Sequence, residues 1–157
     1  VYRYFENKSQ VLIEVLSAAI QHEIQILNSI AQSEQGPEVK LRKAVTTFVK
    51  RAMNSPQLAY SLMFEPVDPG LEHERFRSKQ LIKESIIEIL SEGKASGEFE
   101  FQDLNTAALC VVSTMTFVVI EPLSPSQYAK FDQSYIDFFV KQIADFCVNA
   151  VKRQSEH

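Results

Sequence analysis

The spacing of the apolar residues constrains the fold most, because they recur three and four positions apart along nearly the whole chain. This spacing puts them on one face of an α-helix, whereas a half-buried strand needs an alternation that no segment sustains. Most proline and glycine residues lie at 36–37, 66–70, 97 and 122, where helices would have to end. The sequence therefore predicts an all-α fold, a multi-helix bundle of about six helices.

The ends of the expected helices carry recognisable signals. Asp103 is a good N-cap residue, and Gly97 is well placed to terminate a helix. Phe99 and Phe101 are expected to pack the connection between these two residues onto the core. The first expected helix begins near Lys8, runs for five or six turns and is broken at Gly36-Pro37. The others run over 37–54, 56–64, 71–97, 104–120 and 132–152, with the sequence EPVDPG at 65–70 as a loop.

Two of these helices carry more apolar surface than one subunit can cover. The segment 104–120, LNTAALCVVSTMTFVVI, is apolar around almost its whole circumference, and the last helix has Phe138 beside its apolar stripe. An exposed patch of that size is unusual in a monomer. We therefore expect a two-fold symmetric homodimer held by a four-helix bundle of these helices. Its expected interface residues are Val112, Met115, Val119, Phe139, Ile143 and Phe146.

Charge and composition narrow the partners. The chain has 16 Lys and Arg residues against 20 Asp and Glu, for a formal net charge of −4. Duplex binding needs clustered positive charge, so this segment by itself is expected to bind nucleic acid poorly. Its two cysteines lack paired spacing and are expected to be free thiols. No run of about eighteen apolar residues and no leader pattern was found, so we expect a soluble, cytoplasmic protein that does not enter a membrane.

Catalytic and metal-binding patterns are missing from the sequence. His22, His73 and His157 are scattered, and the members of the triplet at 72–74, Glu-His-Glu, point around a helix, so neither a metal nor a cofactor is expected. No catalytic triad, phosphate-binding glycine loop or dinucleotide fingerprint is present. We therefore expect no enzyme. A helical enzyme without a recognisable motif and a ligand-independent dimerisation module are the alternatives.

The first residues, VYRYFENKSQVLIEVL, carry the most specific pattern. Aromatic residues at Tyr2, Tyr4 and Phe5 precede an Asn-Lys pair ending at Lys8, and Leu12 follows in a capped helix. This order resembles the junction that closes the helix-turn-helix head of the TetR (tetracycline repressor) family of bacterial transcriptional regulators. The resemblance implies a TetR-like C-terminal domain for ligand binding and dimerisation at 9–157. Residues 1–8 would be the remnant of the DNA-binding head, most of which is missing from the sequence.

The same resemblance implies a function. The chain would belong to a ligand-responsive, DNA-binding regulator, by default a repressor that a small molecule releases from its operator. Operator DNA would be bound through the missing N-terminal head, with phosphate contacts from Tyr4, Lys8 and Tyr2.

A small hydrophobic or amphipathic effector is implied as well, enclosed among the helices of the body. The alternative for the aromatic and methionine residues of these helices is an ordinary core. The hydroxyls of Ser113, Thr114 and Thr116 would bond either the backbone one turn back or the ligand. The expected pocket residues are Phe48, Met53, Tyr60, Met63, Phe64, Phe76, Gln80, Cys110, Thr114 and Phe117.

Overall fold

The structure is a computed structural model that describes residues 8–66, 68–127 and 130–155. Over these residues it is an all-α bundle, as the sequence predicts, with one isolated antiparallel bridge between Phe99 and Lys152. The helices are α2 (Lys8–Ala31), α3 (Pro37–Asn54), α4 (Pro56–Met63), α5 (Pro69–Ser96), α6 (Leu104–Phe117), α7 (Ile120–Leu123) and α8 (Gln133–Val151).

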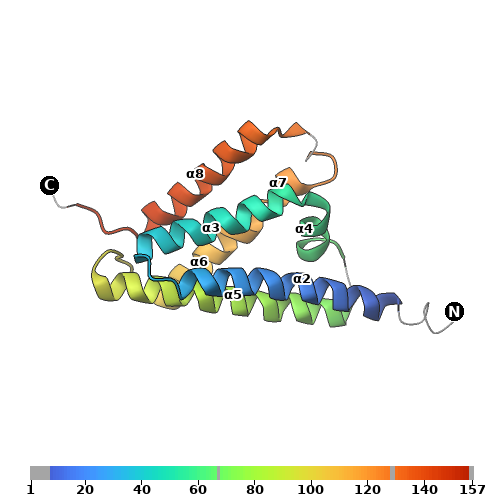
Figure 1. Ribbon diagram of the computed structural model, residues 1–157, viewed down its shortest axis with the longest axis horizontal. Coiled ribbons are helices and arrows are strands. Elements are labelled where there is room, and N and C mark those ends of the chain that lie inside the picture. The colour runs from blue at the N-terminus through green and yellow to red at the C-terminus, as the bar shows by residue number, and fades with distance from the viewer. Residues whose placement is uncertain (1–7, 67, 128–129, 156–157) are drawn as a thin grey trace.

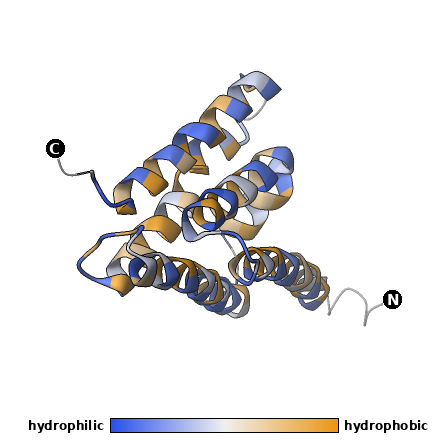
Figure 2. Ribbon diagram, turned by 60° about the vertical axis from the view of Figure 1, so that its left-hand side comes forward, coloured by the Kyte–Doolittle hydropathy of each residue, from blue (hydrophilic) through white to orange (hydrophobic). Residues whose placement is uncertain are grey.

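The long helices α2 and α5 lie side by side along one edge of the molecule, α8 lies on the opposite side, and α3 runs between them (Figure 1). Helix α3 packs most extensively on α8 and also contacts α2, α5 and α6. Its residues Leu41, Val45 and Val49 are completely buried. Figure 2 shows that the outer helices have both a hydrophilic and a hydrophobic side. Helix α3 is buried along the stripe of apolar residues that includes these three, as its central position requires.

A buried lysine ties three helices together at one end of the bundle. Lys40 Nζ on α3 donates to the backbone oxygen of Ala31 at 2.9 Å and to Glu92 Oε2 on α5 at 2.8 Å. Ala31 is the last residue of α2, so the ammonium group lies at the negative end of that helix. The cost of burying this charge is offset by both contacts.

Local capping explains where the later helices begin. The carboxylates of Asp68, Asp103 and Asp132 each accept a hydrogen bond from the backbone N–H three residues further on, at 3.0, 2.8 and 2.8 Å. Pro69 occupies the first turn of α5, so this helix begins before the expected Leu71 and the loop before it is shorter than predicted. Gly97 ends α5 with a left-handed φ of 82°, as expected.

The predicted single helix over 104–120 is wrong at its C-terminal end. Helix α6 ends at Phe117, and α7 is a separate helix of four residues. Pro122 explains the break, because its ring would clash with the carbonyl four residues earlier in a continuous helix but is tolerated in a first turn. By length and hydropathy the stretch Leu104–Leu123 could cross a membrane, a test that the core helix of a soluble protein passes equally well.

The connection between α5 and α6 packs as predicted. Phe99 is 3% exposed and its ring lies against Gly93 of α5, while Phe101 is partly buried. Glu100 N donates to Val151 O at 2.8 Å, and Arg153 N donates to Glu98 O at 2.9 Å. These bonds fix the end of α8 to the end of α5.

Candidate functional site

A cavity of about 280 Å³ lies where α2, α3, α4 and α5 meet, with one residue of α6 in its wall. This volume is close to the lower end of small-molecule sites, roughly 300–1,000 Å³. Half of the lining is apolar, and several rim residues are exposed, so the cavity opens to solvent on one side. The apolar lining residues are Ile20, Phe48, Ala52, Leu58, Ala59, Leu62, Met63 and Ile82, and the polar ones are Glu23, Arg51, Asn54, Ser55, Arg75, Ser78, Lys79 and Thr116.

The two buried hydroxyls of the lining are turned toward their own helices. Ser78 Oγ donates to Glu74 O at 2.7 Å, and Thr116 Oγ1 donates to Val112 O at 2.8 Å. Both residues are about 5% exposed. Since their protons are already used, a molecule in the inner part of the cavity meets mainly alkyl and aromatic surface.

Arg75 holds the short helix α4 against α5. Its Nε donates to Leu62 O and its Nη2 to Ser61 O, both at 2.7 Å, and the residue is 8% exposed. These carbonyls lie in the last turn of α4, where a cation is favourable. The guanidinium therefore fixes one wall of the cavity, and its Nη1 also lies 3.6 Å from Glu72 Oε2.

An ion pair joins α2 and α3 at the rim of the cavity. Arg51 Nε donates to both carboxylate oxygens of Glu23, at 2.8 and 3.0 Å. Lys79 Nζ lies 5.5 Å from the centre of the Phe117 ring and makes no ion pair with any carboxylate that the structure describes. The lining thus contains three cations and one carboxylate, and Glu72 adds a second carboxylate beside Arg75, so positive side chains outnumber negative ones at the cavity.

Two of the ten predicted pocket residues, Phe48 and Met63, line the cavity. Met53 is buried in the core beside it, and Tyr60 and Phe64 pack edge to face against each other with centroids 5.7 Å apart. The remaining five lie elsewhere. Phe76 and Gln80 are on the exposed face of α5, and Cys110 and Phe117 are on the exposed face of α6. Thr114 Oγ1 donates to Cys110 O at 2.8 Å, the backbone alternative.

The prediction chose residues by type, whereas the angle around each helix decides which face meets the cavity. On α5 that face carries Arg75, Ser78 and Lys79, directly beside the exposed Phe76. Sequence reasoning missed Arg75, Lys79, Arg51 and Glu23. A signal was available for Arg75, because it shares the helical stripe of the apolar residues Leu71 and Ile82.

Most of the predicted interface residues lie inside the chain's own core. Val112, Met115, Val119 and Ile143 are 4%, 0%, 0% and 6% exposed, and Phe139 is partly buried. These placements correct the expected stripes, because packing on α3 and α5 uses the most regular apolar face of each helix.

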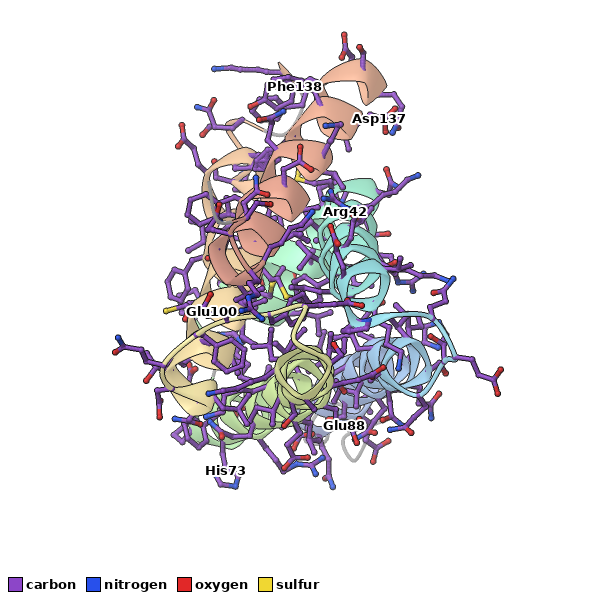
Figure 3. All side chains as sticks on the ribbon, turned by 90° about the vertical axis from the view of Figure 1, so that its left-hand side faces the viewer. Arg42, His73, Glu88, Glu100, Asp137 and Phe138 are labelled. Atoms are coloured by element: carbon purple, nitrogen blue, oxygen red, sulfur yellow. The ribbon has the colours of Figure 1, made fainter. Side chains whose placement is uncertain are left out.

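A different set of apolar side chains remains exposed on the same two helices. Of the predicted residues, Phe146 belongs to this set and is 66% exposed. Figure 3 shows Phe138 and Asp137 on opposite sides of α8, with Asp137 on the side of Arg42. The exposed set, here called the α6–α8 apolar face, consists of Leu109 and Phe117 on α6 and Tyr135, Phe138 and Phe146 on α8.

Tyr2 and Tyr4 lie outside the described residues, as does His157. Lys8 is the first residue of α2. His22 and His73 are exposed, and His73 points away from the bundle in Figure 3. Within 8–66, 68–127 and 130–155, no group of three His, Cys, Asp or Glu residues could hold a metal ion.

Cys147 and Cys110 differ in environment. Cys147 is buried on α8, and this burial raises the pKa of its thiol to about 11. Cys110 is exposed beside the α6–α8 apolar face. Neither lies at the cavity.

Neither a family model nor a curated protein matches this chain. Solved structures do match in fold. A TetR/AcrR-family transcriptional regulator from Thermobifida fusca YX-ER1 has a TM-score of 0.72 at 18% identity, and the match covers 97% of this chain and 79% of that one. The fatty acid degradation regulator FadR from Bacillus halodurans has a TM-score of 0.75 at 21% identity, and the match covers 96% of this chain and 80% of that one. The fold is that of the TetR-type regulators.

A third structure, a bacterial regulatory protein in the TetR family from Rhodococcus RHA1, has a TM-score of 0.70 at 17% identity, and the match covers 99% of this chain and 80% of that one. All three neighbours are described as regulators, and the first and third as members of the TetR family. At these identities the likeness concerns the TetR-type fold itself. The cavity described above therefore lies inside the body of a TetR-type fold, with α2 as one of its walls.

Proposed function

We propose that this chain is the effector-binding and dimerisation part of a TetR-family transcriptional regulator, a DNA-binding repressor that a small molecule releases from its operator. The observation that carries the proposal is the cavity of about 280 Å³ to which α2 contributes Ile20 and Glu23. The TetR-type fold and the pattern from Tyr2 to Leu12 support it. The regulator acts in the cytoplasm, where its operator lies.

The domain boundary falls at the start of α2. Residues 1–8 resemble the end of a helix-turn-helix head, and 9–157 form the body. Operator DNA is bound through the N-terminal head, to which Tyr2, Tyr4 and Lys8 contribute phosphate contacts. The body supplies the ligand response. The net charge of the chain, −4, does not favour DNA binding by the body.

Coupling between the cavity and the head passes along α2. This helix runs for 24 residues from Lys8, and its side chains Ile20 and Glu23 contact the cavity near its middle. A ligand that packs against them favours one tilt of α2, and with it one separation of the two heads in a dimer. Operator affinity falls in proportion to the ligand's differential affinity for the two arrangements.

The dimer that this mechanism needs forms through the α6–α8 apolar face. Three phenylalanines of that face are at least 60% exposed: Phe117 at 60%, Phe138 at 62% and Phe146 at 66%. Pairing the same two helices across a two-fold axis buries these rings in a four-helix bundle. Of the interface residues expected from sequence, this homodimer keeps Phe146 and replaces the others with neighbouring residues on the same helices.

Two alternatives explain the structure less well. An enzyme needs convergent acid and base groups, but the single carboxylate in the cavity, Glu23, is bonded to Arg51, and the lining contains no histidine or cysteine. A dimerisation module that binds no ligand has no use for an open cavity with an apolar interior. Both therefore rank below a sensor.

A thermal-shift screen with a matched cavity variant tests the proposal. A metabolite and drug library is screened against the wild-type chain, Ala59→Phe and Ala95→Phe. Ala59 is a buried lining residue, whereas Ala95 is exposed at the far end of α5. We expect compounds that raise the midpoint of wild type and Ala95→Phe but not of Ala59→Phe. If Ala59→Phe keeps every shift, the cavity is not the sensor site.

A further inference from the structure

The cationic side chains of the cavity outnumber its carboxylate, and they differ in how many of their hydrogen-bond donors already have a partner. Arg75 is committed to the carbonyls of Ser61 and Leu62. Arg51 and Lys79 are exposed at the rim, and Arg51 engages Glu23 through Nε alone. Its two Nη groups make no hydrogen bond with any residue the structure describes. Two cationic side chains thus have donors available for an incoming group.

The interior of the cavity has the opposite character. Its wall is built from aliphatic and aromatic side chains such as Phe48, Leu62 and Ile82, and the buried hydroxyls there donate to their own helices. An apolar body therefore gains from entering, whereas a polar one loses its hydration without a matching partner. Together, a positive rim and an apolar interior select a molecule with one acidic end.

We infer that the effector is an amphiphilic anion, an apolar chain ending in an acidic group, and that this acidic group competes with Glu23 for Arg51. The inference rests on the proposed sensor function and specifies the chemistry of the same cavity. The chain fills the apolar interior, and Lys79 and Arg51 hold the acidic end at the rim. A guanidinium offers a fork of donors that suits an oxyanion.

The competition gives the ligand a direct effect on α2. Glu23 belongs to α2 and Arg51 to α3, so their ion pair is a tie between the two helices. A second anion on Arg51 repels the Glu23 carboxylate and weakens this tie. By reciprocity, the Glu23 carboxylate lowers the affinity of the cavity for the anion. Removing that negative charge should therefore tighten anion binding, although it removes an ion pair.

The test uses three probes of equal chain length, decanoate, decanol and decylamine, each displacing the neutral dye Nile red from the wild-type chain. We expect decanoate to bind most tightly and decylamine most weakly. Shortening decanoate to octanoate and hexanoate should weaken binding about fourfold per methylene removed. If decanoate and decanol both displace the dye but decanoate binds no more tightly than decanol, the inference is overturned and the proposed sensor function is retained.

Variants of the rim supply the second arm. Arg51→Gln and Lys79→Gln should each weaken decanoate and leave decanol unchanged, whereas the control Lys50→Gln, exposed on α3 outside the cavity, should change neither. Glu23→Gln should strengthen decanoate binding by up to about fivefold, the range of an exposed ion pair, and the gain should be smaller in an Arg51→Gln background, where only the direct repulsion between the two carboxylates is removed. Weaker decanoate binding by Glu23→Gln overturns the competition. If neither the dye nor any probe binds the chain, the proposed sensor function fails instead.

Discussion

The contact between Gly93 and Phe99 permits a sharp test of how the bundle is held at one end. Gly93 lies in the last turns of α5 and is buried. A Cβ atom built on it would stand 1.9 Å from Cδ2 of Phe99, a ring that is itself 3% exposed. Gly93→Ala therefore forces the ring out of its site, although alanine is the better helix former.

The magnitude follows from opposing terms. Replacing glycine by alanine inside a helix normally stabilises by about 1 kcal/mol. Overpacking a filled core costs about 1–3 kcal/mol, so we expect Gly93→Ala to have a net destabilising effect of up to about 2 kcal/mol. Phe99→Ala alone should cost about 3–5 kcal/mol by leaving a cavity. In that background the clash is gone, and adding Gly93→Ala should stabilise by up to about 1 kcal/mol.

A double-mutant cycle measured by urea unfolding with circular dichroism gives the coupling free energy, which we expect to equal the overpacking cost of about 1–3 kcal/mol. All four proteins are compared at one fixed concentration, because dissociation of the proposed dimer would make the measured stability depend on it. Ala95→Gly, at an exposed position of the same helix, is the control and should cost the same in both backgrounds. The reasoning is refuted if Gly93→Ala stabilises the wild type, or if it changes stability equally with and without the Phe99 ring.

Four further predictions concern the interface, the thiols, pH and DNA. Phe146→Glu changes an exposed ring and should give a folded monomer in sedimentation velocity, so a dimeric Phe146→Glu variant would contradict the proposed interface. Met115→Glu changes a fully buried position and should unfold the chain. Cys110 should react with a thiol reagent faster in the Phe146→Glu monomer than in wild type, and equal rates in both proteins would count against the same interface. Cys147 should react only after unfolding, because burial raises the pKa of its thiol to about 11. Hydrogen bonds from Lys141 and Arg42 hold the pKa of Asp145 below its ordinary 3.8. The stability advantage of wild type over Asp145→Asn should therefore be present above pH 3.8 and vanish as the pH falls through the lowered pKa. An advantage that grows on acidification would contradict this prediction. Finally, the chain as given, with its net charge of −4, should not bind duplex DNA in a sequence-specific way, and a specific band in a gel-shift assay would disprove this.

Helix identity and most helix bounds could be predicted from the sequence because the signals are local. An aspartate cap acts on a backbone N–H three residues away, and Gly97 terminates α5 through its own φ angle. The predicted ends of α3, α4 and α8 agree with the structure to within a residue or two for the same reason. The two errors, at Pro69 and Pro122, both concern a proline that the structure places inside the first turn of a helix.

The cavity was predicted only in outline. Helices α3, α4 and α5, which were expected to line a pocket, do contribute to the cavity, and Phe48 and Met63 lie in its wall. The angular position of each residue was not, so the exposed Phe76 was chosen in place of its neighbour Arg75. The Arg51–Glu23 pair joins residues 28 positions apart, and no local pattern brings them together.

The sequence by itself determined that this chain is an all-α bundle, where most of its helices begin and end, and that α6 and α8 carry more apolar surface than one core can cover. Only the tertiary structure decided which stripe of those helices is buried. Met115 and Val119 are completely buried and Phe117 between them is not, because α6 packs against α5 and α8 at an angle that depends on every other helix in the bundle. Helical periodicity is set by hydrogen bonds within four residues, whereas burial is set by contacts between segments distant in the chain.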